Sequence, residues 1–408
     1  MNRNNYTKPN IFIYRFVQLV AFVFAMLVFH RKMLRNELRG VQGPFVVIAN
    51  HQAAYDFVNL IGASSRPMSF VLSNSFYNSL PIQGILNGIG VIPKQQFQTS
   101  LSDMKRMKAV VDNGQPLVIY PAGLMCEDGL STPIPRATYK FLKWLGVDVY
   151  VARTSGTYFA MPKWTHGFRP GRTYMDIYRL FTAEQVRTLS AEEIREQAEA
   201  ALLFDAYREQ EQLKVRYADN DNLEGLEQVL YMCPHCGSEF TMQVHERSTI
   251  RCTSCGYEER SDPYAMLHNH KGLGQELRYV SDWSSMILER TRERLRAKRE
   301  FRLASATKIL MLDYQKHKFV EVGSGTLSLT HEQFELDGEV SGKPLALTLS
   351  STQFPTLPFV PGKYLELQSG DEIYRCVLAD GRLVMKFINL LKANHALREQ
   401  ELACAAKR

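Results

Sequence analysis

The sequence predicts an α/β domain, followed by a cysteine-rich segment and a small β-rich domain. From Gly43 to about residue 215, short apolar runs alternate with helical stretches, as in an α/β sheet. Between residues 233 and 255, cysteines form two C-x2-C pairs. Beyond about Arg302, apolar and polar residues alternate with a period of two, which is typical of half-buried β-strands. A chain of 408 residues is too long for one ordinary core, so several units are expected.

The composition indicates which cellular compartment and which classes of binding partner to expect. The chain is 45% hydrophobic and 22% charged, which indicates a globular protein. Its net charge of +7 is mild for this length, and no basic patch with aromatic residues predicts nucleic-acid binding. Cys126, Cys376 and Cys404 are scattered, while the other cysteines have metal-site spacing. No disulfide framework is therefore expected, and the reducing cytosol is favoured.

The first apolar segment, residues 11–29, is almost long enough to cross a bilayer, although Arg15 and Gln18 interrupt it. Basic residues flank it: Arg3, Lys8, Arg31, Lys32, Arg35 and Arg39. A spanning helix, an interfacial helix and a buried core helix all fit this pattern. The flanking charges favour an anionic membrane surface. We therefore expect an N-terminal membrane helix within residues 1–40, which anchors the protein at the cytoplasmic face of the cell membrane.

The α/β domain is expected over residues 41–218. The apolar runs predict strands at 44–50, 68–73, 90–94, 116–123, 147–159 and 172–181. Helical periodicity predicts helices at 56–65, 80–88, 99–114, 135–146 and 190–214. In such a sheet, the loops at the strand ends carry the chemistry.

A polar cluster follows the first of these strands. Asn50 and His51 end the strand, and Asp56 comes five residues after the histidine. A carboxylate bonded to one ring nitrogen fixes the tautomer and leaves the other nitrogen basic, so the pair suits a general base acting on a hydroxyl. No serine or cysteine nucleophile is evident beside it, which favours direct attack by a substrate hydroxyl. From spacing alone, a surface histidine and a helix-capping aspartate remain an open alternative.

The Asn50-His51-x4-Asp56 segment resembles motif I, N-H-x4-D, of the glycerolipid acyltransferases related to bacterial 1-acylglycerol-3-phosphate acyltransferase. Further along, GVIPK (90–94) resembles the second motif of that family. VIYPAG (118–123) resembles the third motif, an apolar strand that ends in F-P-E-G, and VDVYVA (147–152) stands where the fourth is expected. The order and spacing agree over roughly residues 40 to 215.

The resemblance implies a glycerolipid acyltransferase fold and a mechanism. His51 would deprotonate the acceptor hydroxyl, and Asp56 would orient and stabilise the histidine. The alkoxide would then attack an acyl thioester of coenzyme A or acyl carrier protein. Lys94 would hold the phosphate of a lysophospholipid of the 1-acylglycerol-3-phosphate type, in phospholipid biosynthesis. Asn50 would belong to the substrate site, and backbone groups near Gly123 would stabilise the oxyanion.

The sequence departs from the family pattern at positions that are expected to recognise the acceptor. The glutamate of the third motif is Ala122, its basic position reads Leu124-Met125, and the proline of the fourth motif is Ala152. Lys94 keeps a charge but lacks the planar fork of arginine. Arg136 and Arg153 could replace lost phosphate contacts, so Arg153 joins the substrate-binding candidates. Two alternatives stay open: a different acceptor such as a lyso-aminolipid, and a non-catalytic membrane lipid-binding scaffold.

The second cysteine pair follows the first in a C-x2-C-x15-C-x2-C arrangement, with a glycine after each pair. This spacing suits one tetrahedral structural Zn(II) ion held by Cys233, Cys236, Cys252 and Cys255. The segment 225–262 resembles a zinc ribbon. Its neighbours are acidic rather than basic, which favours a structural or protein-docking role.

The remaining chain is expected to contain a connecting helix at 263–302 and a β domain at 303–400. The alternating strands with glycine turns, followed by a terminal amphipathic helix, resemble a PH-like or GRAM-like domain. Such domains bind lipid or protein, and a plain packing module is the alternative.

Overall fold

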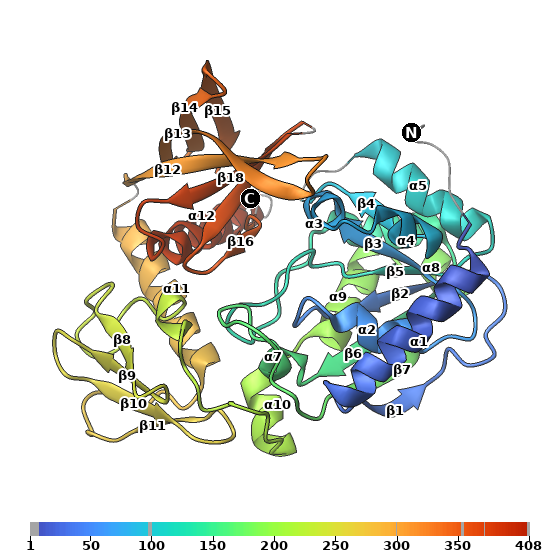
Figure 1. The fold of residues 1–408 in the computed structure, drawn as a ribbon, viewed down its shortest axis with the longest axis horizontal. Coiled ribbons are helices and arrows are strands. Elements are labelled where there is room, and N and C mark those ends of the chain that lie inside the picture. Colours follow the sequence, from blue (N-terminus) through green and yellow to red (C-terminus); the bar gives the residue numbers. More distant parts are fainter. Residues whose placement is uncertain (1–7, 97–99, 299, 352–354, 371, 406–408) are drawn as a thin grey trace. The chain divides into compact units, whose positions relative to one another are not determined.

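The computed structural model describes residues 8–96, 100–298, 300–351, 355–370 and 372–405 (Figure 1). The chain divides into two compact units. Unit 1 comprises Met1–Pro162 with His166–Asp219, and unit 2 comprises Lys163–Thr165 with Asn220–Arg408. The finer division into five domains that the sequence suggests stays a prediction.

Unit 1 is built on a mixed seven-stranded sheet with the strand order β1-β7-β6-β2-β5-β3-β4. Its strands are β1 (Lys32–Asn36), β2 (Phe45–Ala49), β3 (Ser69–Ser73), β4 (Ile92–Lys94), β5 (Leu117–Ile119), β6 (Asp148–Ser155) and β7 (Tyr174–Phe181). All neighbours pair in parallel except β6 and β7. Strand β2 lies at the centre and is buried at every position, as its continuous apolar run predicts.

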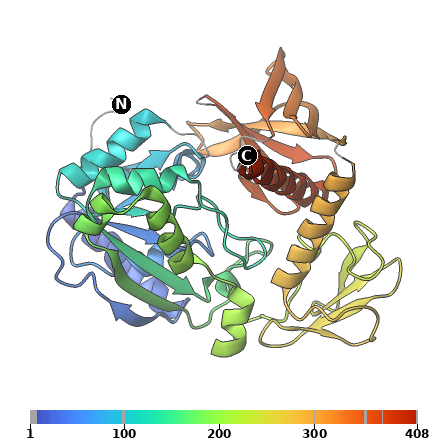
Figure 2. The same cartoon turned by 180° about the vertical axis from the view of Figure 1, so that it is seen from behind.

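The helices described in unit 1 are α1 (Ile11–Leu27), α2 (Asp56–Ile61), α3 (Asn74–Ser79), α4 (Gln83–Gly88), α5 (Leu101–Asp112), α6 (Ala137–Leu145), α7 (Thr157–Ala160), α8 (Ala183–Thr188), α9 (Ala191–Leu202) and α10 (Ala206–Leu213). Side chains from α5, α6, α8 and α9 form one apolar core with β2, β5 and β6. Figure 2 shows helices lying over the sheet on this side. The predicted α/β fold of this region is confirmed.

Two predicted elements end earlier than expected, and both breaks lie near the candidate site. The strand expected over 147–159 stops at Ser155, because Gly156 adopts a left-handed φ of 88° and starts α7. The helix expected over 190–214 is two helices. The second helix, α10, begins at Ala206, and the carboxylate of Asp205 before it accepts the backbone N–H groups of Tyr207 and Arg208 and so caps the helix.

Helix α1 differs from the membrane anchor that the sequence predicts. Among the residues that the structure describes, no helix combines the length and the apolar character needed to cross a membrane. The anchor expected over residues 11–29, and the membrane localisation that rested on it, are therefore wrong.

The polar residues that interrupt α1 tie it to the loop after α2. Gln18 donates to the carbonyl of Ile61 at 3.1 Å, and Arg15 donates to the carbonyl of Ser65 at 2.6 Å. Tyr14 is fully buried, and its hydroxyl accepts the backbone N–H of Met68 at 3.0 Å. The hydrogen bonds of α1 are thus made within unit 1.

Unit 2 begins with a short helical turn η1 (Leu226–Gln228) and an antiparallel four-stranded sheet of β8 (Met242–His245), β9 (Thr249–Cys252), β10 (Glu258–Ser261) and β11 (Leu267–Asn269). The long helix α11 (Val280–Ala297) follows. Its Trp283 is fully buried and donates from Nε1 to the carbonyl of Met232 at 2.9 Å. Helix α11 is therefore anchored to the cysteine-rich segment.

The C-terminal part of unit 2 is β-rich, as expected. Strands β12 (Arg302–Asp313), β13 (Lys318–Thr330), β14 (Gln333–Val340), β15 (Lys343–Ser350), β16 (Phe359–Val360), β17 (Tyr364–Ser369) and β18 (Glu372–Leu378) form one antiparallel sheet. Helix α12 (Leu383–Ala405) ends the chain, and its residues Val384, Phe387 and Leu391 are buried. The PH-like or GRAM-like identity of this part stays a prediction.

The packing of α1 generates a stability prediction. Tyr14→Ala should lower the free energy of unfolding by about 3–5 kcal/mol, because it removes a fully buried ring and a hydrogen bond to the backbone. Phe12→Ala is the matched control on the same helix, since Phe12 is 83% exposed, and it should change the value by less than about 0.5 kcal/mol. Urea denaturation followed by circular dichroism measures both. Equal effects of the two substitutions would contradict the described packing.

Candidate active site

His51 and Asp56 meet directly after β2. The Nδ1 atom of His51 lies 2.9 Å from Oδ2 of Asp56. Asp56 starts α2 and is fully buried, whereas the His51 side chain is 19% exposed. An ionised carboxylate only accepts hydrogen bonds, so the proton of a neutral imidazole lies on Nδ1 and Nε2 keeps its lone pair. This geometry suits a general base.

The turn between the two residues encloses the carboxylate. Oδ2 of Asp56 also accepts the backbone N–H groups of Gln52, at 2.7 Å, and Ala53, at 3.0 Å. Gln52 in turn accepts the N–H of Tyr158 and the hydroxyl of Thr157, both at 3.2 Å, through its Oε1. The turn is therefore fixed to α7, which exists because β6 stops early.

Asn50 joins the two central strands. Its Nδ2 donates to the carbonyl of Thr154, and its Oδ1 accepts the N–H of the same residue, both at 2.8 Å. Asn50 is buried. The amide that the sequence placed in the substrate site thus clamps the end of β2 to β6, and it positions His51 through the backbone.

Tyr120 stacks against the histidine. The parallel register pairs Ile48 with Ile119, so the residue after β5 lies beside the end of β2. The ring centroids of His51 and Tyr120 are 4.5 Å apart, with a tilt of 34°. Burial, and then the charge of Asp56, raise the pKa of Tyr120, which keeps its hydroxyl protonated. Sequence reasoning missed this residue, although it stands inside the VIYPAG motif.

The loop after β5 turns tightly at Gly123. Gly123 has a left-handed φ of 71°, and its N–H donates to the carbonyl of Tyr120 at 2.9 Å in a tight turn. Its own carbonyl accepts Nε2 of Gln96 at 2.6 Å. The N–H of Gly123 is therefore engaged within the turn, and the role of other backbone groups near it stays a prediction.

The two expected phosphate ligands lie outside the lining of the pocket beside His51. Lys94 ends β4 and donates from Nζ to the carbonyl of Gln95 at 2.8 Å, and burial lowers its pKa. Arg153 on β6 forms an ion pair with Glu209 at 2.5 Å. Neither residue lines the pocket beside His51.

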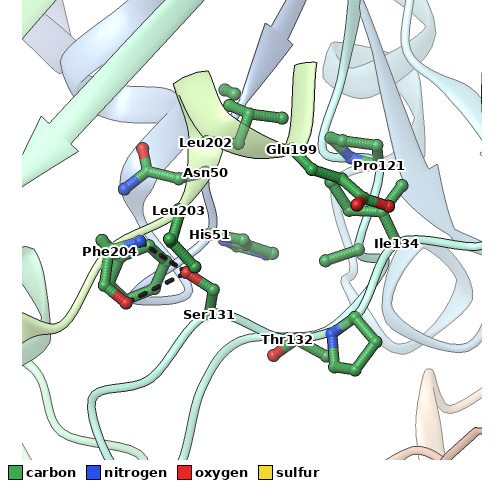
Figure 3. A pocket seen from close by; sticks show the side chains of 13 residues that line it. Asn50, His51, Pro121, Ser131, Thr132, Ile134, Glu199, Leu202, Leu203 and Phe204 are labelled. Carbon is green, nitrogen blue, oxygen red and sulfur yellow. Dashed lines mark hydrogen bonds between the residues drawn. The ribbon is translucent and has the colours of Figure 1, made fainter. Parts of the chain in front are cut away.

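A pocket of about 280 Å³ opens at His51 (Figure 3). Its walls are the end of β2, the loop after β5, the segment 131–134 and the break after α9. The residues that line it are Ala49, Asn50, His51, Pro121, Ala122, Ser131, Thr132, Pro133, Ile134, Glu199, Leu202, Leu203 and Phe204. The early end of α9 places Leu203 and Phe204 in this wall. Sequence reasoning gave no signal for Glu199, which lies in an ordinary amphipathic helix.

The four cysteines of unit 2 converge. Their sulfur atoms all lie within 4.8 Å of one another. The distances are 3.7 Å between Cys233 and Cys255 and 3.8 Å between Cys236 and Cys252. Zn–S bonds of about 2.3 Å correspond to S···S edges of about 3.8 Å in a tetrahedron. The donor set and its spacing therefore fit a closed four-thiolate metal site.

Backbone turns present these sulfurs. The N–H of Gly237 donates to the carbonyl of Cys233, and that of Gly256 donates to the carbonyl of Cys252, both at 3.0 Å. Both glycines have a left-handed φ, of 72° and 78°. This conformation explains the glycine after each cysteine pair.

Comparison with known proteins agrees with these features. Residues 28–152 match the family described as Acyltransferase. Residues 226–258 match a zinc-ribbon family described as DNA directed RNA polymerase, 7 kDa subunit. No curated protein matches the chain.

Two solved structures show a likeness. One is the 1-acyl-sn-glycerophosphate (LPA) acyltransferase PlsC from Thermotoga maritima, with 18% identity and a TM-score of 0.42 over 49% of this chain and 79% of that one. The other is the Ran binding domain of the nuclear complex component Nup2 from Ashbya gossypii. It has 18% identity and a TM-score of 0.19 over 24% of this chain and 97% of that one.

The family matches cover the two segments whose geometry is described above. The first contains the His51–Asp56 pair and ends in β6, and the second contains all four cysteines. This chain therefore contains a domain of the acyltransferase family, to which a zinc ribbon is added.

Proposed function

We propose that this protein transfers a fatty acyl group from a thioester to the hydroxyl of a lysophospholipid, with His51 as the general base. The hydrogen bond between His51 and the buried Asp56, at the wall of a pocket, carries the proposal. The donor would be acyl-CoA or acyl carrier protein. The acceptor that the family resemblance suggests is of the 1-acylglycerol-3-phosphate type, in phospholipid biosynthesis.

The reaction balances with these groups alone. Nε2 of His51 takes the proton of the acceptor hydroxyl as its oxygen bonds to the thioester carbon. The negative charge of Asp56 stabilises the imidazolium that forms. The tetrahedral intermediate then expels the thiolate, which takes the proton from His51. Holding the hydroxyl and the thioester together contributes much of the acceleration.

The way Asp56 is held supports a catalytic role for the pair. Asp56 is fully buried, and its Oδ2 lies 2.9 Å from Nδ1 of His51 and accepts two backbone N–H groups. This fixed carboxylate orients an imidazole whose side chain is 19% exposed and lines a pocket, which is what a general base requires. A non-catalytic lipid-binding scaffold has no need of such a pair.

The base assignment gives the first functional prediction. His51→Ala and Asp56→Asn should each lower turnover by about a hundredfold or more, because the first removes the base and the second removes the charge that stabilises its protonated form. The measurement is mass spectrometry of purified protein with labelled acyl-CoA or acyl carrier protein and a panel of lysolipids. His166→Ala, at an exposed position of unit 1, is the matched control. Undiminished turnover by His51→Ala would refute the assignment.

Tyr120 is proposed as a positioning residue for the imidazole. Tyr120→Ala should lower kcat about two- to twelvefold, the rate equivalent of an aromatic contact worth about 0.5–1.5 kcal/mol, with little change in KM. Tyr120→Phe keeps the ring and should restore kcat. If Tyr120→Phe is as slow as Tyr120→Ala, the hydroxyl and not the stacking is what matters.

We also propose that Cys233, Cys236, Cys252 and Cys255 hold one structural Zn(II). Protein purified without added metal should contain about one zinc per chain by elemental analysis. Cys236→Ser should lose the metal, since three thiolates no longer close the site. Ser254→Ala, between the second pair of ligands, is the control and should keep it. Iron in place of zinc, or a folded sample without metal, would contradict the proposal.

A further inference from the structure

The pocket beside His51 has an unexpected charge. Besides the histidine, Glu199 is the ionisable residue that lines it, and none of the described lining residues is lysine or arginine. Figure 3 shows Glu199 and His51 on the wall of the same pocket. Ala122 contributes only a methyl group. A carboxylate therefore reaches this pocket from α9, and the loop after β5 supplies none.

Glu199 is held in place by two donors. The hydroxyl of Tyr139 donates to Oε1 at 2.9 Å, and Nη1 of Arg195 donates to Oε2 at 2.9 Å. Burial, and then the hydrogen bond to Glu199, raise the pKa of Tyr139, so its hydroxyl remains a donor. A carboxylate has about four acceptor sites, so further donors can still bind. The Glu199 side chain is 40% exposed, which leaves those sites open to a ligand.

Arg195 neutralises Glu199 only in part. The same guanidinium also pairs with Glu192, with Nε 3.0 Å from its Oε2. Its one positive charge is therefore shared between two carboxylates. Arg136 lies close enough for its charge to lower the pKa of Glu192, after the larger effect of the Arg195 hydrogen bond. Both arginines therefore interact with glutamates of α9.

This charge discriminates between head groups. A phosphomonoester dianion would meet Glu199 without a cation from the pocket wall, and like charges in contact disfavour binding. An ammonium group would instead form a charge-assisted hydrogen bond to the carboxylate. Lys94 and Arg153 do not line this pocket, so they do not supply the cation that a phosphate would need there.

We infer that the acceptor is a lysolipid with an amine-bearing head group, and that Glu199 is the residue that selects it. The inference rests on the proposed acyl transfer and names the acceptor class for the same pocket. The free hydroxyl of the lysolipid would lie at His51, and its ammonium group at Glu199.

The test compares two acceptors at a fixed acyl-CoA or acyl carrier protein donor. A lysophospholipid with an ethanolamine head group and lysophosphatidic acid are offered to the full chain in the same neutral micelles. The wild type should favour the amine-bearing acceptor in kcat/KM by about tenfold or more, the effect of one charged hydrogen bond. Glu199→Gln should abolish most of this preference by raising KM for the ethanolamine-bearing acceptor.

Matched variants separate charge from structure. Glu196→Gln, on the same helix but outside the pocket lining, should leave the preference unchanged. Glu199→Asp should retain part of it. Leu203→Arg adds a cation at a lining position that is 64% exposed, so the fold tolerates it, and it should raise turnover of lysophosphatidic acid.

The outcomes distinguish this inference from the proposed function. Preference of the wild type for lysophosphatidic acid, or an unchanged preference in Glu199→Gln, would overturn the acceptor class while acyl transfer stands. If neither acceptor nor any other lysolipid is acylated, the proposed function itself fails, and the inference fails with it.

Discussion

The hydrogen bond between His51 Nδ1 and Asp56 Oδ2 is the interaction on which the site depends. A fully buried carboxylate is stable only where donors surround it, and here the donors are the imidazole and two backbone N–H groups of the intervening turn. The turn must therefore be held rigidly. Gln52 ties it to α7, and Asn50 ties its first residue to β6. The central sheet thus fixes the orientation of the histidine.

Much of unit 1 and the cysteine cluster of unit 2 could be predicted because their signals are local. The apolar run of β2 and the polar residues that end it predict a buried strand with chemistry at its carboxyl end. The Asn50-His51-x4-Asp56 motif predicts the pairing, and the cysteine spacing predicts the convergence of four sulfurs. In each case, residues close in sequence, or backbone conformations such as the glycine after each cysteine pair, are enough to define the arrangement.

The remaining features depend on contacts between distant segments. Tyr139 and Glu199 are far apart in sequence, so nothing in the pattern of α9 indicates that its carboxylate lines a pocket. Lys94 was expected to bind phosphate from its motif position, but it does not line the pocket beside His51. Helix α1 is apolar enough to suggest an anchor, yet its two polar residues bind backbone carbonyls within unit 1.

The central claim is that His51 activates a lipid hydroxyl for acyl transfer. The direct measurement is tandem mass spectrometry of the lipid formed when the wild-type protein and His51→Ala each meet a 13C-labelled acyl thioester and a panel of lysolipids. Label is expected in an ester at the free hydroxyl of at least one lysolipid with the wild type, with one free thiol released per ester, and it should be lost with His51→Ala. Label only in an amide, no labelled lipid from folded wild-type protein, or undiminished ester formation by His51→Ala would contradict the claim.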